Sequence, residues 1–559
     1  MKRILLLFIP VVLFSACEFM EPMPIQDQTT EDLWSHATYG EGILTTAYAR
    51  LQNSYPVNMD YYTDNAVPSQ PGLNKLALGS WTIENNPIGD WDNSYNSIKY
   101  LNIFIDHGTT LTYSVSDQVK DSILKANRMG EAYFLRAWYQ WQLLKNYAGY
   151  STNGTEALGF PIVTTVLEQG DDLDLPRNTY EECVTQIVSD CDKAIAILPL
   201  MYNQGTDPYL GLRSRGRASG LGAMALKATV YLNAASPAYG SSSQALWQRA
   251  AVAAAEAIQA SGGLLDLADY ANFNTAGSFD NIWIQPTYLG RGEEMSFYPP
   301  SLYGAGLCNP SQNLVNAFPA IDGYPIDRSS NYDANNPYLN RDPRFYRFIF
   351  FNEDNYNSTI IQTQEGGADS PGGLNQQGTR TGYYLKKLTS KKVRLKPGSM
   401  NTDVKFYVYL GKTELYLNFA EAANKALGPN DASLGFSAVD VMKTIRKRAG
   451  IDSDAAAEGY DDQYLTEQAG AGADAFNEFI LETRRLELCF EGFRFWDIRR
   501  LNLPMNHTVK GVKITGTTGA FTYQYVDVEN HSFQEYMRYV PVPYSQTLIM
   551  DNLEQNSGW

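Results

Sequence analysis

Residues 482–500 constrain the fold more than any other stretch, because charged side chains stand there among large aromatic and aliphatic ones. Arg484 and Glu487 are three residues apart, and Glu487 and Glu491 are four apart, so a helix would make each pair neighbours on its surface. A charge beside buried aromatic rings is stable only when an opposite charge pairs with it. We therefore expect one long helix over residues 474–500 that carries a lattice of structural salt bridges. A catalytic pair of carboxylates is the alternative, and no other motif supports it.

Apolar residues recur at helical spacing through much of the chain. Thr179 and Glu182 form a capping box, which marks the start of one predicted helix. The helices come in pairs, as in tetratricopeptide-like solenoids, but the sequence repeat is poor and the pairs are interrupted, so periodicity alone does not settle the fold. The predicted helices span 30–53, 91–106, 117–147, 179–198, 218–235, 243–260, 411–427, 436–449 and 474–500.

The helical period stops between residues 262 and 410, where Gly, Pro, Asn and Asp become frequent. A loop region of this length in an ordered protein is usually functional. Aromatic residues are dense within it, so we expect it to face a ligand. These aromatic residues are Trp283, Tyr288, Phe297, Tyr298, Tyr303, Tyr324, Tyr332 and Tyr338.

The chain of 559 residues has a formal net charge of −17, and by length alone it has room for two to four domains. Such an acidic protein repels polyanions and has no electrostatic footprint for nucleic acid, so a neutral ligand fits best. One short basic run stands out, and we interpret it as a solvated hairpin. A contact with an acidic partner surface is the alternative. The run consists of Lys386, Lys387, Lys391, Lys392, Arg394 and Lys396.

The N-terminus has the features of a secretory signal: a basic start, an apolar run too short to span a bilayer, and small residues before Cys17. Its form is similar to a lipoprotein signal, which would be removed as residues 1–16 and leave Cys17 acylated. An ordinary signal with an incidental cysteine is the alternative. Residues 17–29 then form a tether. No later apolar run is long enough to span a membrane, so we expect an anchored protein rather than a membrane-spanning one.

The five cysteines do not form a disulfide scaffold in a chain of this size. Cys183 and Cys191 lie eight residues apart on one predicted helix, which separates their Cα atoms by about 12 Å, beyond the ~7 Å limit of a disulfide. We expect both to be free, buried thiols, as are Cys308 and Cys489. No Cys/His spacing indicates zinc, and we predict no metal and no cofactor.

The sequence also lacks the motifs of common enzymes. It has no phosphate-binding glycine loop between a strand and a helix, no Gly-x-Ser-x-Gly elbow and no His-Glu-x-x-His pair. With 61 acidic residues, a pair of carboxylates at glycosidase spacing can always be found, so it carries no weight. We expect a binding protein and not an enzyme.

The pattern Arg484-x-x-Glu487-Leu488-x-Phe490-Glu491-Gly492-x-Arg494-x-x-Asp497-x-x-Arg500 resembles the signature near the C-terminus of the SusD/RagB family. Members of that family are outer-membrane nutrient-binding lipoproteins of Bacteroidetes-type bacteria. Further segments resemble family motifs in the same order, so the resemblance runs from the signal to the last residue. These segments lie at 91–102, 216–228, 231–237, 309–318, 341–344, 381–384 and 555–559.

The resemblance implies a mostly α-helical fold with four irregular tetratricopeptide-like repeats and a large loop-rich, ligand-facing region. Glu18 and Glu21 resemble the acidic tag that sends such lipoproteins to the cell surface. The chain is then divided as follows: signal peptide 1–16, lipid-anchored tether 17–29, N-terminal helical scaffold 30–261, loop-rich region 262–410, C-terminal helical repeats 411–500 and irregular C-terminal segment 501–559.

The implied function is capture of an oligosaccharide or polysaccharide and its delivery to a SusC-like TonB-dependent transporter. Capture of peptides, as in the RagB branch, is the second hypothesis. A hydrolase is the third hypothesis, and a scaffold that binds no ligand is the fourth. Sugar rings pack their C–H faces on aromatic side chains while polar groups bind their hydroxyls. By position in the loops, we predict as ligand-binding residues Trp283, Tyr288, Tyr298, Tyr303, Tyr61, Tyr62 and Asn74.

Overall fold

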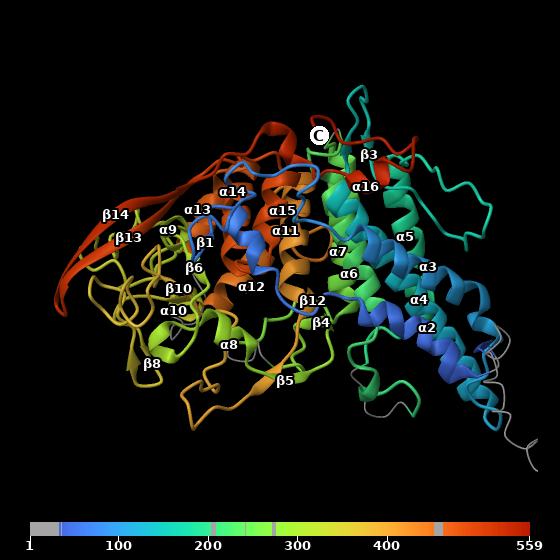
Figure 1. The fold of residues 1–559 in the computed structure, drawn as a ribbon, viewed down its shortest axis with the longest axis horizontal. Helices are drawn as coiled ribbons and strands as arrows, with labels where there is room; N and C mark the ends of the chain where they lie inside the picture. Colours follow the sequence, from blue (N-terminus) through green and yellow to red (C-terminus); the bar gives the residue numbers. More distant parts are fainter. Residues whose placement is uncertain (1–32, 35, 203–207, 241, 271–274, 452–461) are drawn as a thin grey trace, which may run out of the picture.

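The structure is a computed structural model that describes residues 33–34, 36–202, 208–240, 242–270, 275–451 and 462–559. Within these ranges most regular structure is helical, as predicted. Figure 1 shows α2 to α7 on one side, α11 to α15 in the centre, and the loop-rich segment with a long hairpin on the other side. The long helices are α2 (Ala37–Ala49), α3 (Trp91–His107), α4 (Gln118–Tyr147), α5 (Tyr180–Ile197), α6 (Gly220–Ala235), α7 (Gln244–Ala260), α11 (Lys412–Leu427), α12 (Ala438–Ala449), α13 (Gln463–Gly470), α14 (Ala473–Glu487) and α15 (Phe493–Arg500).

Neighbouring helices pack in chain order from α2 to α7, and α7 then packs against α11, which contacts α12 and α14. The helix-pair scaffold is therefore continuous across the loop-rich segment between α7 and α11. Two local features explain its helices. The predicted capping box of α5 is present, with the Thr179 hydroxyl accepting from the Glu182 amide. The alanines of α6 and α7 allow these helices to approach closely.

The prediction of a single helix over 474–500 is wrong. Helix α14 ends at Glu487 and α15 begins at Phe493, because Phe490 (φ 66°) and Gly492 (φ 86°) adopt left-handed backbone conformations between them. A Cβ atom on Gly492 would lie 2.7 Å from the Pro56 side chain, so glycine suits this turn for a second reason. The turn changes the direction of the chain between α14 and α15 and thereby changes which charges meet.

The predicted salt-bridge lattice is confirmed, although its partners differ from the expected ones. Asp497 accepts from Arg484 at 2.9 Å and from Arg500 at 2.8 Å. Glu487 pairs with Arg344 on α10 (Pro343–Phe348) and Arg448 on α12, rather than with Arg484 on its own helix. The charges therefore join helices that are distant in sequence.

Each strand pairs antiparallel with one partner, and all are short except β13 and β14, which have 10 and 11 residues. Two of the pairs lie at the two ends of the loop-rich segment, where β4 pairs with β12 and β5 pairs with β11. The pairs are β1 (Ala66–Pro68) with β6 (Cys308–Pro310), β2 (Gly149–Tyr150) with β3 (Ala157–Leu158), β4 (Asn281–Ile284) with β12 (Val408–Gly411), β5 (Tyr288–Gly290) with β11 (Asp403–Lys405), β7 (Ile349–Phe350) with β10 (Tyr384–Leu385), β8 (Asn355–Tyr356) with β9 (Thr359–Ile360), and β13 (Thr508–Thr517) with β14 (Ala520–Asn530).

The prediction of free, buried thiols is confirmed for Cys183, Cys191, Cys308 and Cys489. Burial raises the pKa of Cys183 to about 12, so this thiol stays protonated at neutral pH. The predicted acylation site, Cys17, lies outside the described residues. Among the residues that are described, no helix is both long and apolar enough to cross a membrane.

Candidate ligand-binding surface

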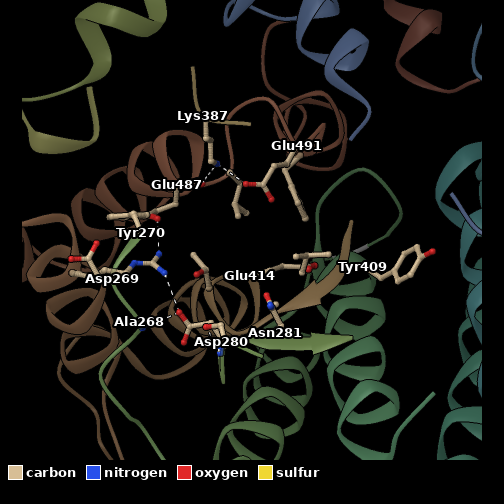
Figure 2. Close-up of a pocket in the computed structure, with 17 residues that line it drawn as sticks. Ala268, Asp269, Tyr270, Asp280, Asn281, Lys387, Tyr409, Glu414, Glu487 and Glu491 are labelled. Atoms are coloured by element: carbon tan, nitrogen blue, oxygen red, sulfur yellow. Dashed lines mark hydrogen bonds and ion pairs between the residues drawn. The ribbon is translucent and has the colours of Figure 1, made fainter. Parts of the chain in front are cut away.

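A small cavity of about 50 Å³ lies where the loop-rich segment meets α11, α12 and α14. Figure 2 shows Lys387 reaching toward Glu487 and Glu491 on one side, with Glu414 across the cavity. A volume of this size holds a few water molecules and excludes a sugar ring. The lining residues are Ala268, Asp269, Tyr270, Ser278, Asp280, Asn281, Lys387, Val408, Tyr409, Gly411, Thr413, Glu414, Arg448, Glu487, Leu488, Glu491 and Phe493.

Ion pairs hold most of the charged groups around this cavity. The Lys387 ammonium donates to Glu491 at 2.5 Å, and Arg448 donates to Glu487 at 2.7 Å. Burial alone would raise the pKa of Glu487, but Arg448 and Arg344 outweigh it and hold that pKa below its ordinary value. A paired network of this kind fixes the three surrounding helices, so we interpret the cavity as structural.

An open groove of about 580 Å³, which we call the tyrosine groove, lies beside the cavity. Tyr288 on β5 contributes an exposed ring, and Glu293 on α8 (Gly292–Phe297) lies close to its hydroxyl. The Oε1 atom of Gln285 is buried and has no hydrogen-bond donor in the described part of the chain. The groove thus combines aromatic rings with the partly exposed Glu293 carboxylate as an acceptor for hydroxyl groups. Its lining residues are Asn53, Ser54, Tyr55, Gln285, Tyr288, Gly292, Glu293, Ser296, Phe297 and Leu388.

A second open groove, of about 590 Å³, is rich in cations, and we call it the basic groove. Residues 386–392 separate the two grooves: Leu388 lines the tyrosine groove, and the residues on both sides of it line the basic groove. Lys387 lines both the basic groove and the central cavity. The basic groove is lined by Asp269, Tyr270, Thr275, Tyr346, Arg347, Phe348, Asn355, Tyr356, Lys386, Lys387, Thr389, Ser390, Lys391, Lys392 and Asp403.

The interpretation of the basic run as a solvated hairpin is wrong for its first two lysines. Lys387 is buried against Glu491, and Lys386 is half-buried and bonded to Asp354 at 2.7 Å. The segment forms turns rather than a hairpin. Its first two lysines bond to Asp354 and Glu491 instead of standing on a strand that pairs with a neighbour. The remaining four basic residues of the run are exposed, as expected.

Trp283, predicted to be a stacking platform, is a core residue with 1% of its surface exposed. Its ring packs edge-on against Phe134 and Trp138 at centroid distances of 4.8 and 5.0 Å, and its Nε1 donates to the carbonyl of Gly216 at 3.0 Å. The ring joins β4 to α4, so no face is left for a ligand. The prediction is wrong because Trp283 lies on β4, a strand that was not predicted from the sequence and that packs its ring against α4.

Tyr298 and Asn74 are also buried, with 2% and 1% exposed, so neither presents a surface to a ligand. The Tyr298 hydroxyl donates to the carbonyl of Ser390 at 2.7 Å. The Asn74 amide donates to Glu529 on β14 and to a carbonyl of the first loop. Both side chains hold loops in place.

Tyr288 and Tyr303 are the exposed members of the predicted set, at 42% and 54%. Tyr288 lies on β5, before α8 in the chain, and Tyr303 lies directly after the turn that follows α8. Tyr61 and Tyr62 are partly buried: the Tyr61 hydroxyl contacts the carbonyl of Leu307, and the Tyr62 ring packs against Phe495. The structure thus brings Tyr288 into a groove and leaves Tyr303 on the surface, and their role in binding stays a prediction.

The groove residues that sequence reasoning missed are Tyr55, Gln285 and Glu293. Tyr55 belongs to a loop more than two hundred residues away from the other two, so no local pattern links them. Among the described residues, no group of three His, Cys, Asp or Glu side chains is arranged to hold a metal ion.

Two family models match the chain. One, described as "SusD family", covers residues 267–559, and the other, described as "Starch-binding associating with outer membrane", covers residues 25–232. A curated relative, the SusD-like protein P38 of Formosa agariphila, is 23% identical over 549 residues, which is 92% of this chain and 93% of the relative.

Solved structures share the fold across nearly the whole chain. A SusD-like protein from Bacteroides fragilis aligns with a TM-score of 0.74 and 22% identity, covering 96% of this chain and all of that one. A SusD-like carbohydrate-binding protein from the same species aligns with a TM-score of 0.71 and 20% identity, covering 93% of this chain and all of that one. The predicted mostly α-helical fold of SusD type is confirmed.

Proposed function

Because this chain belongs to the SusD family, we propose that it is a cell-surface lipoprotein that binds an oligosaccharide or polysaccharide and delivers it to a SusC-like TonB-dependent transporter of the outer membrane. The observation that carries glycan binding is the tyrosine groove. It is open, its volume suits a short oligosaccharide, and it offers the exposed Tyr288 ring together with the partly exposed carboxylate of Glu293. Sugar C–H faces pack on such a ring while the hydroxyls donate to the carboxylate.

The carboxylates beside the groove favour binding over catalysis. Glu293 and Glu294 both pair with the ammonium of Lys405, at 3.5 and 2.5 Å. A glycosidase needs two carboxyl groups on opposite sides of the scissile bond, one of them protonated. Two carboxylates that share one lysine do not provide that arrangement.

The location rests on two supports. The family model over residues 25–232 is described by association with the outer membrane, and the sequence around Cys17 has the form of a lipoprotein signal. Acylation of Cys17 attaches the protein to the membrane, and the transporter takes up the captured glycan. Isolation of the protein from outer membranes with a TonB-dependent transporter bound to it is the expected result of a pull-down.

Glycan binding is tested by calorimetric titration of the protein with oligosaccharides and with mixed peptides. Saturable heat with a glycan, without new reducing ends, supports the proposal. Heat with peptides alone contradicts it and assigns the protein to the peptide-capturing alternative. New reducing ends from a bound glycan would assign it to the hydrolases.

A further inference from the structure

The basic groove concentrates positive charge in a protein whose formal net charge is −17. Five cationic side chains line it, against the two carboxylates of Asp269 and Asp403. Potentials inside a groove depend on the charges within about 8 Å at physiological salt, so this local excess acts on a ligand despite the acidic remainder of the surface.

Two of these cations are available to a ligand. Lys386, Lys387 and Arg347 each pair with a carboxylate, at 2.7, 2.5 and 2.8 Å. Lys391 and Lys392 are exposed, and neither forms a salt bridge with any residue in the described ranges. The positive charge that the groove presents therefore resides in these adjacent lysines.

The backbone that carries the two lysines is fixed on both sides. The Asn357 amide donates to the carbonyl of Lys391 at 2.9 Å, and the Asn401 amide donates to the carbonyl of Lys392 at 3.0 Å. The preceding residue, Ser390, donates its amide to buried Glu294 at 2.6 Å and its hydroxyl to Asp403 at 2.6 Å. A segment fastened in this way is preorganised, so less conformational entropy is lost when a ligand binds.

Two of the cations that line the groove also lie beside aromatic rings. The Lys391 ammonium lies 5.7 Å from the centre of the Tyr356 ring, and Arg347 lies 5.3 Å from the centre of the Tyr270 ring. The Tyr356 ring is buried, so it supports Lys391 from below, and the lysines are the groups that the groove offers to an anionic ligand.

We propose that the basic groove binds an anionic substituent, a carboxylate or a sulfate ester, of the same glycan whose neutral sugar rings occupy the tyrosine groove. The inference rests on the proposed function. The proposal requires the glycan to cross residues 386–392, the segment that separates the two grooves, where the consecutive residues Leu388 and Thr389 line one groove each. The acidic surface elsewhere repels a polyanion, so the ligand carries its anionic groups sparsely along a neutral chain.

The test is calorimetric titration of the full chain in detergent with matched pairs of oligosaccharides. Each pair has one neutral member and one member that differs by a single anionic group: a xylo-oligosaccharide with and without a glucuronic acid branch, and a galacto-oligosaccharide with and without a sulfate ester. We expect the anionic member of a pair to bind about tenfold more tightly, through charge-assisted hydrogen bonds to lysine. The two pairs distinguish the carboxylate from the sulfate.

The variant K391Q/K392Q removes both available cations, and R394Q/K396Q is its matched control. The control removes the same charge from exposed residues of the same segment that do not line the groove. We expect K391Q/K392Q to bind both members of a pair with the affinity of the neutral one, and R394Q/K396Q to keep the preference. Circular dichroism checks that both variants are folded. In the unmodified protein, the preference should decrease as salt is raised.

The outcomes separate this inference from the proposed function. Equal affinity of the unmodified protein for the neutral and anionic members overturns the inference and leaves glycan binding intact. So does an equal loss of the preference for the anionic member in both variants. Absence of binding to every oligosaccharide overturns both. Binding of poly-glutamate that depends on Lys391 and Lys392, with no glycan bound, also overturns both and assigns the groove to acidic peptides.

Discussion

Arg500 binds Glu421 with both ends of its guanidinium group, each donor nitrogen lying 2.7 Å from one carboxylate oxygen. The pair is buried and connects α15 to α11. Arg500 also donates to Asp497 at 2.8 Å, so one side chain satisfies two carboxylates. The C-terminal helices are thus held together by charges as well as by apolar packing.

Replacing Arg500 with alanine should lower the free energy of unfolding by about 3–5 kcal/mol, because it leaves Glu421 buried without a partner. Urea denaturation followed by circular dichroism measures this loss. The matched control is Arg328→Ala, which removes an exposed salt bridge to Glu467 and should change stability by less than about 1 kcal/mol. Equal effects in the two variants would contradict a structural role for the buried pair.

Tyr288→Ala should weaken glycan binding about tenfold, or ~1.4 kcal/mol, with little change in stability, because the ring is exposed in the tyrosine groove. Calorimetry gives the affinity and thermal unfolding gives the stability. Tyr288→Phe, which keeps the apolar face, is the control and should retain most of the affinity. Unchanged affinity in the alanine variant would show that Tyr288 does not contribute to ligand binding.

Trp283→Ala should lower the stability and leave the glycan affinity unchanged, the opposite of Tyr288→Ala. The ring is enclosed by Phe134, Trp138 and Tyr409, so its removal leaves a cavity in the core and should cost about 3–5 kcal/mol of stability. The folded fraction should bind glycan normally. Loss of affinity without loss of stability would restore Trp283 as a ligand platform.

Glu414 should make stability fall as the pH rises between about 4.5 and 7, against the opposite contribution of His531, whose pKa burial lowers to about 4. Burial raises the pKa of Glu414 from 4.5 to about 7, so in this range the folded protein holds a proton that the unfolded chain has released. The free energy of unfolding that is lost over this pH range through Glu414 is on the order of 3 kcal/mol. Urea denaturation at pH 5, 6, 7 and 8 measures it.

The control for this pH dependence is Glu414→Gln, which cannot release the proton and should flatten the curve. It should not flatten it fully, because burial also raises the pKa of Asp60 to about 6, and this group acts in the same direction. A Glu414→Gln variant with the slope of the unmodified protein would contradict the assignment.

The thiols of Cys183, Cys191, Cys308 and Cys489 should not react with a thiol reagent in the folded protein and should all react in urea. Burial raises the pKa of both Cys183 and Cys489 to about 12, which leaves almost no thiolate at neutral pH. Spectrophotometric titration with a chromogenic disulfide reagent counts the reactive groups. Rapid reaction of any one thiol before unfolding would place it in a mobile region.

The helical scaffold could be predicted from the sequence because its determinants are local: apolar periodicity, a capping box and alanine-rich faces. The turn between α14 and α15 could not, since Phe490 adopts a left-handed conformation only because packing on both sides fixes it. The charged residues around it were recognised as a paired lattice, but their partners depend on that turn.

The candidate site was harder to predict, because exposure depends on tertiary packing. Trp283 and Tyr288 are five residues apart, yet one fills the core and the other faces a groove. Position in a loop-rich region does not separate these cases. The basic run was visible in the sequence, whereas its division into one buried lysine, one half-buried lysine and a pair facing a groove required the fold.

The continuity of α7 with α11 has a consequence for how such proteins diversify. The loop-rich segment leaves the scaffold and returns to it at neighbouring points, where β4 meets β12 and β5 meets β11. Changes at exposed positions between these two strand pairs therefore spare the helix packing, whereas Arg344 and Lys387 in the same segment hold Glu487 and Glu491 and must be kept. A segment exchanged between homologues at these strands would carry the whole lining of the basic groove except Asp269, Tyr270 and Thr275, and most of the tyrosine groove, while Asn53, Ser54 and Tyr55 would stay with the recipient.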